Sequence, residues 1–348
     1  MFGGITLNIK NRDAIGKVAV IAIVAVVVAG AFGAFFLIKN LRGGGGTGGN
    51  EPYSDPLIQG AYGIGSKFTY DFVYYKEDGA SVTPPAPQFT AEIVGQSGSY
   101  YMLAASSTSG GSPSPFAMIH KNTGELRFSK NIGSDSTTYG GKNVSLKKWE
   151  WVMIDGTIGD INTFSKYTLS SSPNDAIPYK IATEFRTNDT SYSYTSMDVS
   201  LVLSSTSIVP PTEYVPSGNV GKGCVYSVST KYLGKMFTGE ETVLCVAEGS
   251  GLLFAMNKAE LKCGEEGITS VYYYTKSSMD SLLRGNYIPS PYGTPSSTAT
   301  ISTIDGNVLC DVYGYGLYVG QSNGVSYLYE QYNGSDLIHK VSLIRRIG

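Results

Sequence analysis

The sequence predicts an all-β ectodomain on an N-terminal transmembrane helix, with a Gly-rich linker and two tandem antiparallel β-sandwich or barrel domains. Three observations lead to this fold class. Residues 18–38 form an unbroken apolar run, a glycine-rich stretch follows it, and the remainder consists of short alternating runs separated by Gly, Ser, Asn and Pro. Strands at this density, without long amphipathic helices, are typical of sandwiches and barrels.

The apolar run from Val18 to Ile38 has the length of a membrane span. Its 21 residues carry no charge, and as a helix they would reach roughly 31 Å, the thickness of a hydrocarbon core. A secretory signal has a shorter apolar region of about 7–15 residues, and a buried helix would show a polar edge. We therefore favour an uncleaved signal anchor over a cleaved signal peptide, for which small residues between Ala29 and Ala34 offer sites, and over a core helix.

Orientation follows from the large C-terminal part of the chain, because the basic residues flanking the run are nearly balanced. That part carries all four cysteines and three Asn-x-Ser/Thr glycosylation sites, at Asn143, Asn188 and Asn333. We expect residues 1–17 to be a cytoplasmic stub. The protein is then a single-pass glycoprotein of the cell membrane, with most of its chain extracytoplasmic.

The segment Arg12-Asp13-Ala14-Ile15-Gly16, directly ahead of the apolar run, resembles the class III signals of archaeal pilin-like proteins. This resemblance implies cleavage ahead of the hydrophobic helix; a basic stub before a signal anchor is the other interpretation. The chain as a whole resembles single-span, surface-anchored β-rich ectodomain proteins of archaea. That resemblance implies an extracellular, cell-surface location.

Domain boundaries follow from glycine and proline. Residues 39–56 read as a linker, since the run from Gly43 to Gly49 loses too much entropy on ordering and behaves as a flexible tether. The remaining chain is long enough for two domains. We place them at residues 57–208 and 213–348, separated at Pro210-Pro211, because paired prolines stop strand pairing.

Two pairs of similar segments indicate an internal duplication of one β-domain. Residues 64–72 (IGSKFTYDF) parallel 220–228 (VGKGCVYSV), and residues 198–203 (DVSLVL) parallel 340–345 (KVSLIR). A tandem repeat explains both similarities. The alternative is that strand-rich segments resemble one another at this level without common origin.

Alternation of apolar and polar residues predicts thirteen strands. They are expected at residues 67–75, 89–94, 100–105, 126–129, 177–185, 198–203, 224–230, 242–246, 252–256, 271–275, 308–319, 326–329 and 340–344. One short helix is expected at residues 278–284, where SMDSLLR begins with a serine and ends before a glycine.

The four cysteines, Cys224, Cys245, Cys263 and Cys310, all lie in the second half. An even number in an exported domain predicts two disulfides, with three pairing schemes open. Free buried thiols are the second interpretation. A zinc site is disfavoured, because zinc ligands usually come in closely spaced pairs.

Charge and motif content limit the function classes. The net charge is −2 without a basic cluster, which disfavours nucleic-acid binding. The two histidines, His120 and His339, have no obvious partner. The Gly320–Gly324 run matches G-x-S-x-G but lies between strand-like runs rather than before a helix. The acidic groups Asp155/Asp160 and Glu240/Glu241/Glu248 read as solvated loop residues. We expect neither a catalytic site nor a metal or cofactor.

Aromatic residues give the remaining site candidates. Trp149 and Trp151 are two apart, so a strand would place both on one face. Exposed, they could bind a glycan or a protein; buried, they belong to the core, which we favour. We expect a non-catalytic binding, adhesion or envelope-structural role. The alternatives are a structural subunit of a filament or membrane-containing virion and, third, an extracytoplasmic hydrolase.

Overall fold

The computed structural model describes residues 62–105, 113–190, 192–211, 215, 217–232, 234–284, 288–289 and 291–348. The predicted membrane span at residues 18–38 and the linker at residues 39–56 lie outside these ranges. Within them, no helix combines the length and the apolarity needed to cross a bilayer.

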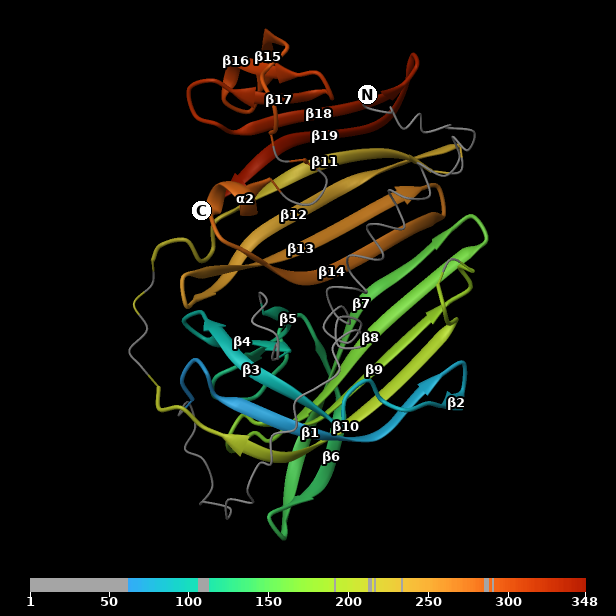
Figure 1. The fold of residues 1–348 in the computed structure, drawn as a ribbon, viewed down its shortest axis with the longest axis vertical. Coiled ribbons are helices and arrows are strands. Elements are labelled where there is room, and N and C mark those ends of the chain that lie inside the picture. The colour runs from blue at the N-terminus through green and yellow to red at the C-terminus, as the bar shows by residue number, and fades with distance from the viewer. Residues whose placement is uncertain are drawn as a thin grey trace, which may run out of the picture.

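The described residues fold mainly into antiparallel strands (Figure 1). The N-terminal half contains β1 (Lys67–Glu77), β2 (Ala80–Ser81), β3 (Gln88–Gln96), β4 (Tyr100–Ala105), β5 (Ser114–His120), β6 (Lys130–Tyr139), β7 (Lys142–Ile158), β8 (Ile161–Ser171), β9 (Pro178–Thr187) and β10 (Ser196–Ser207). The C-terminal half contains β11 (Gly223–Tyr232), β12 (Lys235–Gly249), β13 (Leu252–Cys263), β14 (Glu266–Lys276), α2 (Met279–Leu283), β15 (Ser297–Thr303), β16 (Gly306–Tyr313), β17 (Leu317–Gly320), β18 (Ser326–Asn333) and β19 (Asp336–Ile347).

Both halves follow the same strand order. In the N-terminal half the pairing runs β5-β4-β3-β1-β10-β9-β8-β7-β6. In the C-terminal half it runs β14-β13-β12-β11-β19-β18-β17-β16-β15. In each half the first long strand therefore lies between the second and the last. Among the described strands, only the two-residue β2, which pairs with β1, has no counterpart.

The irregularities of the strands coincide as well. The register of β1 on β10 shifts between Thr69 and Tyr70, and that of β11 on β19 shifts between Val225 and Tyr226. The register of β3 on β4 shifts after Ile93, and that of β12 on β13 shifts after Cys245. These shifts align Leu203 with Leu343, whereas the sequence comparison had matched Leu203 with Arg345. The sequence comparison was therefore wrong by two residues. It still assigned each side chain to the correct face of the strand, because side chains alternate between the faces with a period of two.

The turn that precedes each first strand is also repeated. Gly65 and Gly221 both have positive φ, at 94° and 92°, a conformation that glycine adopts without steric cost. Gly65 N donates to the Ile93 carbonyl at 2.8 Å, and Gly221 N donates to the Cys245 carbonyl at 2.8 Å. The residue after each glycine accepts the return hydrogen bond, at 2.9 Å in both halves.

The halves join into one continuous sheet of 19 strands. Residues 154–157 of β7 pair with residues 267–270 of β14, and Gln96 bridges to Glu248. A Cβ on Gly156 would lie 2.7 Å from the Gly267 carbonyl oxygen, so this close approach requires a residue without a side chain. The two halves therefore share one large antiparallel sheet.

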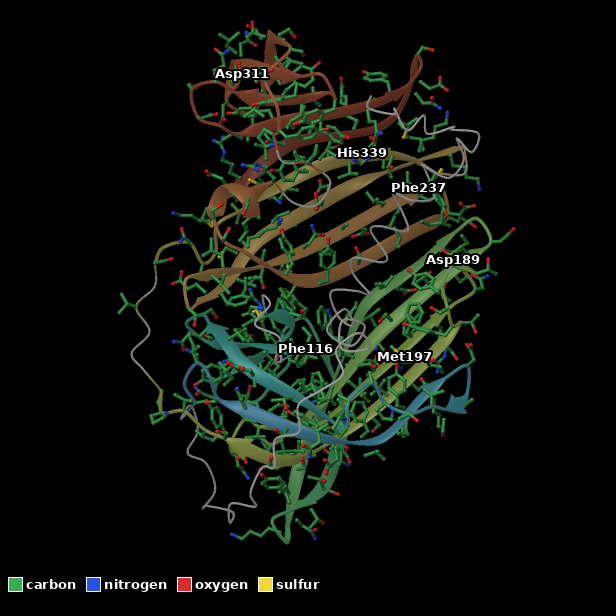
Figure 2. The ribbon with its side chains drawn as sticks, viewed as in Figure 1. Phe116, Asp189, Met197, Phe237, Asp311 and His339 are labelled. Atoms are coloured by element: carbon green, nitrogen blue, oxygen red, sulfur yellow. The ribbon has the colours of Figure 1, made fainter. Side chains whose placement is uncertain are left out.

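Two hydrophobic cores stabilise the sheet. The first core lies mainly in the N-terminal half but also receives Phe254 and Tyr273 from β13 and β14. The second core lies mainly in the C-terminal half, beneath α2, and also receives Ile158 of β7. Figure 2 shows Phe116 of the first core below and Phe237 of the second above. Consecutive buried residues of β13 alternate between the two cores: Phe254 and Met256 belong to the first and Ala255 to the second. This part of β13 is therefore buried on both faces.

Local sequence signals account for several elements. The expected helix is confirmed as α2. Ser278 is its N-cap, because its Oγ accepts a hydrogen bond from Ser281 N at 3.3 Å. The strand expected at residues 308–319 divides into β16 and β17 at a turn where Gly316 has φ of 88°. The strand expected at residues 126–129 is wrong; only an isolated bridge between Leu126 and Ile119 forms there.

Candidate functional site

A buried carboxylate lies in the C-terminal half. Glu241 of β12 is directly opposite Tyr226 of β11, and its exposed fraction is 0%. Asn257 of β13, also 0% exposed, donates a hydrogen bond from Nδ2 to Glu241 Oε1. A buried charged group is costly unless it is hydrogen-bonded or paired. The Glu241–Asn257 contact is therefore a specific feature of this core.

Two phenols complete a polar cluster around Glu241. The Tyr226 hydroxyl donates to the Leu283 carbonyl at the end of α2, and α2 packs over β12, β13 and β14. Burial raises the pKa of Tyr226, and the neighbouring Cys224 and Glu241 raise it further. Burial also raises the pKa of Tyr274 on β14, with added contributions from Glu241 and Cys245. Both phenols therefore remain neutral at physiological pH.

The thiols beside this cluster are protonated. Burial raises the pKa of Cys245 to about 11, and the charge of Glu248 adds to the shift. Burial likewise raises the pKa of Cys224, although Tyr226 and Arg346 oppose it. Because the thiolate is the reactive form, both side chains are weak nucleophiles at neutral pH.

The predicted disulfides do not form; all four cysteines are free in the structure. Cys224 is opposite Val243, which makes Cys245 its diagonal neighbour. Diagonal neighbours lie about 7–8 Å apart, beyond the roughly 4.4–6.8 Å between Cα atoms that a disulfide requires. Cys263, at the end of β13, and Cys310, on β16, are opposite Glu266 and Ala299.

The N-terminal half has no such cluster at the equivalent positions. Tyr70 is opposite Phe89, as Tyr226 is opposite Glu241, and Ala105 takes the place of Asn257. The rings of Tyr70 and Phe89 lie 6.0 Å apart in an apolar core. This strand arrangement therefore forms without the carboxylate and amide, which are particular to the C-terminal half.

A second candidate is an aromatic cluster at the surface. Tyr292 and Tyr315 are stacked, with ring centroids 4.3 Å apart and planes 2° from parallel. Tyr292 N donates to the Tyr315 hydroxyl at 3.0 Å, and the Tyr313 ring lies 5.8 Å from that of Tyr315. Tyr292 is 67% exposed. We call Tyr292, Tyr313 and Tyr315 the tyrosine cluster; a flat, pre-stacked surface of this kind can receive another ring.

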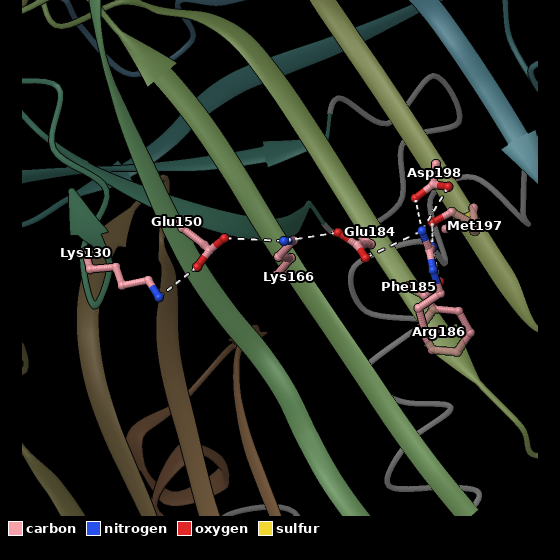
Figure 3. A network of polar contacts seen from close by, with 8 residues as sticks. All are labelled: Lys130, Glu150, Lys166, Glu184, Phe185, Arg186, Met197 and Asp198. Carbon is pink, nitrogen blue, oxygen red and sulfur yellow. Dashed lines mark hydrogen bonds and ion pairs between the residues drawn. The ribbon is translucent and has the colours of Figure 1, made fainter. Parts of the chain in front are cut away.

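A network of alternating charges, the charge ladder, crosses five strands of the N-terminal half (Figure 3). Its ion pairs alternate in sign from β6 to β10: Lys130–Glu150 at 3.0 Å, Glu150–Lys166 at 3.4 Å, Lys166–Glu184 at 3.1 Å, Glu184–Arg186 at 3.5 Å and Arg186–Asp198 at 2.8 Å. Each charge is matched by a neighbour of opposite sign. The ladder therefore reads as cross-strand stabilisation of a solvated face.

The two tryptophans are core residues, as we favoured. Trp149 and Trp151 are 8% and 2% exposed. Trp149 Nε1 donates to Ser171 Oγ at 3.1 Å, and the Trp151 ring is stacked on Tyr167. Neither ring is presented to a ligand.

The three sequons lie at exposed positions on strand ends or turns. Asn143 accepts from Thr138 Oγ1 at 3.1 Å, and Asn333 stands at the end of β18, opposite Asp336. Asn188 donates from Nδ2 to the Asp160 carbonyl at 2.5 Å. The nitrogen of Asn188 that a glycan would occupy is thus engaged, while Asn333 is presented at a hairpin turn.

The remaining sequence candidates are not brought together. His120 Nδ1 accepts from Asn122 N at 3.2 Å within a turn, whereas His339 on β19 packs against Tyr329. The Gly320–Gly324 segment joins β17 to β18, both strands. In the part of the chain that the structure describes, no three His, Cys, Asp or Glu side chains gather as a metal site would require.

Sequence reasoning missed Glu241 as a buried group. It treated the acid as a loop residue, yet Glu241, Val243 and Cys245 alternate along β12 and all point into the second core. The signal available in the sequence was the alternation of Glu241, Val243 and Cys245, a strand pattern with a period of two in which one inward position is an acid. The tyrosine cluster had no comparable signal, because its members come from a loop and a hairpin. No protein-family profile matches the chain, and no curated protein is similar to it in sequence.

Proposed function

We propose that this chain is a membrane-anchored extracytoplasmic protein with a non-catalytic binding, adhesion or envelope-structural role. The observation that carries the binding role is the tyrosine cluster. Aromatic side chains anchor interfaces because they offer large, rigid contact area at low entropy cost. The stacking of Tyr292 on Tyr315 at 4.3 Å holds one ring in place and leaves it 67% exposed.

The chemistry of this surface favours a glycan as its partner. The Tyr292, Tyr313 and Tyr315 rings supply flat apolar faces, and phenol hydroxyls nearby supply hydrogen bonds. A sugar ring presents an apolar face of C–H groups with hydroxyls at its rim, so it matches both features. The protein would hold such a glycan above the membrane through its N-terminal anchor and glycine tether.

The two domains are, in this proposal, copies of one unit. The shared strand order, the matching register shifts at Tyr70 and Tyr226, and the matching turns at Gly65 and Gly221 support a duplication. After it, the copies diverged in their interior. The C-terminal copy gained the Glu241–Asn257 pair and the tyrosine cluster, so we assign the binding role to that copy.

Glycan binding is tested with the full-length protein in detergent on an array of immobilised oligosaccharides of defined composition. We expect the wild type to bind a subset, and Tyr292→Ala and Tyr315→Ala each to abolish that binding. Tyr74→Ala, which removes a 41% exposed tyrosine from the N-terminal half, is the matched control. Binding that survives both cluster substitutions, or no binding by the wild type, would overturn the glycan proposal.

Anchoring is tested separately, by expressing the full chain in cells with an accessible surface. We expect the protein to resist extraction from membranes by alkaline carbonate and to be cleaved by protease added outside the cells. Deletion of residues 18–38 should release it. A full-length protein that is extracted, or that is protected from protease in intact cells, would contradict the anchor or its orientation.

The alternative function, a structural subunit of a surface filament or membrane-containing virion, is favoured by one observation. Strand β15 ends the sheet of the C-terminal half with an uncharged edge, to which another strand can add.

A further inference from the structure

Strand β15 is the terminal strand of the C-terminal half, at the top of the molecule in Figure 1. Among the described strands it pairs with β16 alone, through seven residue pairs from Ser297–Val312 to Thr303–Gly306 without a register shift. Its outer edge therefore presents a regular row of backbone N–H and C=O groups. Such an edge is a template for a further strand unless the sequence blocks it.

The sequence of β15 contains none of the usual blocking features. Its seven residues, STATIST, include no charge and no proline. The edge of the N-terminal half differs. There β6 carries Lys130, whose side chain is 69% exposed, and Asp135, and its register on β7 shifts between Asn131 and Gly133. Charges and bulges of this kind protect natural edges from pairing, so β6 is protected and β15 is open.

The residues of β15 also match their own reverse order. Around Thr300 they read Ala299 and Ile301, then Thr298 and Ser302, then Ser297 and Thr303. We propose that β15 pairs antiparallel with β15 of a second copy of this chain, across a two-fold axis at Thr300. Each residue then meets one of like character: Thr300 with Thr300, Thr298 with Ser302, and Ala299 with Ile301.

The two faces of β15 suit this pairing. Thr298, Thr300 and Ser302 are exposed, and cross-strand Thr–Thr and Thr–Ser pairs stabilise antiparallel sheets. Ile301 lies on the other face, packed against the second core, so the Ala299 of the second copy would extend that apolar layer. Leu309 on β16 is opposite Thr300 and is 48% exposed. The second copy would border its side chain on one side and so reduce its contact with water.

A two-fold pairing closes on itself, because the same seven residues serve both copies. It yields a dimer and occupies both β15 edges, so that a filament or a virion shell would need a second contact elsewhere on the chain in addition to this one. The contact is short, about 24 Å at 3.4 Å per residue, so we expect it to be weak between dissolved molecules. Confinement to a membrane raises the effective concentration and strengthens it. This dimer does not depend on the glycan proposal.

Cysteine cross-linking of the full-length protein, reconstituted in lipid vesicles, tests the register. Thr300→Cys should form a covalent dimer on mild oxidation, because the two side chains meet across the axis. Thr298→Cys and Ser302→Cys should each cross-link poorly alone but should cross-link to one another when mixed. Ser134→Cys on the protected β6 edge is the matched control, and the wild type reports the native thiols.

A second variant separates specific pairing from chance collision. Thr300→Lys, added to both Thr298→Cys and Ser302→Cys, places like charges opposite one another and should abolish the mixed cross-link, with an unchanged near-ultraviolet circular dichroism spectrum showing that the fold is intact. The proposal is overturned if Thr300→Cys gives no more dimer than Ser134→Cys, if all the β15 cysteines cross-link alike, or if Thr300→Lys leaves the mixed cross-link unchanged.

Discussion

Tyr70 and Tyr226 occupy the same position in the two halves of the sheet. Each is the first residue after the register shift in its strand, and each is almost fully buried. The hydroxyl of Tyr70 donates to the Pro178 carbonyl at 2.7 Å, and that of Tyr226 donates to the Leu283 carbonyl. In each half, one tyrosine of the first long strand thus holds a segment outside that strand through a hydrogen bond.

Removal of either hydroxyl should cost similar stability. Tyr70→Phe and Tyr226→Phe each delete one buried hydrogen bond and leave a backbone carbonyl without it, so each should lower the free energy of unfolding by about 1–2 kcal/mol. Urea denaturation measures the effect. Tyr74→Phe, at a 41% exposed position, should change stability by less than about 0.5 kcal/mol. A neutral Tyr226→Phe would show that the α2 contact contributes nothing.

The Glu241–Asn257 pair should behave as a coupled unit. Asn257→Leu removes a buried donor to the carboxylate and should lower the free energy of unfolding by about 1.5–3 kcal/mol. Glu241→Leu with Asn257→Leu makes the site apolar, as Phe89 and Ala105 make it in the N-terminal half, and should be less destabilised than Asn257→Leu alone.

A double-mutant cycle, completed with Glu241→Leu alone, measures the coupling. Strictly additive losses would mean that the two side chains stabilise the core independently, and the pair would then have no joint role. Val243→Ala, which lies on the same strand face between Glu241 and Cys245, is the control for a loss of core packing.

The close approach of the two halves at Gly156 gives a third prediction. A Cβ there would lie 2.7 Å from the Gly267 carbonyl oxygen and 2.8 Å from the Ile268 Cα, both backbone atoms that cannot move alone. Gly156→Ala should therefore separate β7 from β14 locally and destabilise by about 1–3 kcal/mol. Hydrogen exchange should quicken at residues 267–270. Gly98→Ala, with nothing within 4 Å of its added Cβ, should leave both quantities unchanged.

The thiols give a fourth prediction, which follows from their burial. In the folded protein Cys263 is the half-buried thiol, and Cys224, Cys245 and Cys310 are buried. A thiol reagent should therefore modify Cys263 first under native conditions and all four only after denaturation without reductant. Mass spectrometry of the alkylated chain distinguishes the outcomes. Fewer than four alkylations in denaturant would instead indicate the disulfides that the cysteine count predicted.

Local pattern predicted some elements well and long-range pairing not at all. Strand β4 matches its expected range, and α2 was found from Ser278 and its apolar residues. In contrast, β6 has few apolar residues and so shows little alternation, because most of its side chains are exposed. Its neighbour β7 runs for 17 residues through a register shift, which disturbs the period of two. Neither signal could reveal that β7 pairs with β14.

The candidate sites show the same limit. The cysteine count predicted disulfides, but the register that makes Cys224 and Cys245 diagonal neighbours depends on how β11 and β12 align. The similarity of the two halves was visible because Gly65 and Gly221 precede similar strands. What differs between the halves, Glu241 in place of Phe89, could be recognised only once the strands of both halves were aligned by their register shifts.

The charge ladder gives the last prediction, which concerns pH. A hydrogen bond from Lys130, aided by Lys166, lowers the pKa of Glu150 against a smaller opposing effect of desolvation. Because the folded-state pKa lies below the unfolded value, the ladder's contribution is present above the ordinary glutamate pKa and is lost as pH falls through the lowered value. Glu150→Gln should therefore be less stable than wild type at pH 7, by no more than about 1 kcal/mol for these solvent-accessible pairs.

Urea denaturation of wild type and Glu150→Gln between pH 7 and pH 2.5 measures this difference. It should be constant from pH 7 down to about 5, then shrink and vanish as the glutamate becomes protonated. Added salt should reduce it at pH 7, because exposed ion pairs are screened. Glu265→Gln, at an exposed acid in the turn between β13 and β14, is the control. A Glu150→Gln difference that persists at pH 2.5 would mean that side-chain packing, not charge, links β6, β7 and β8.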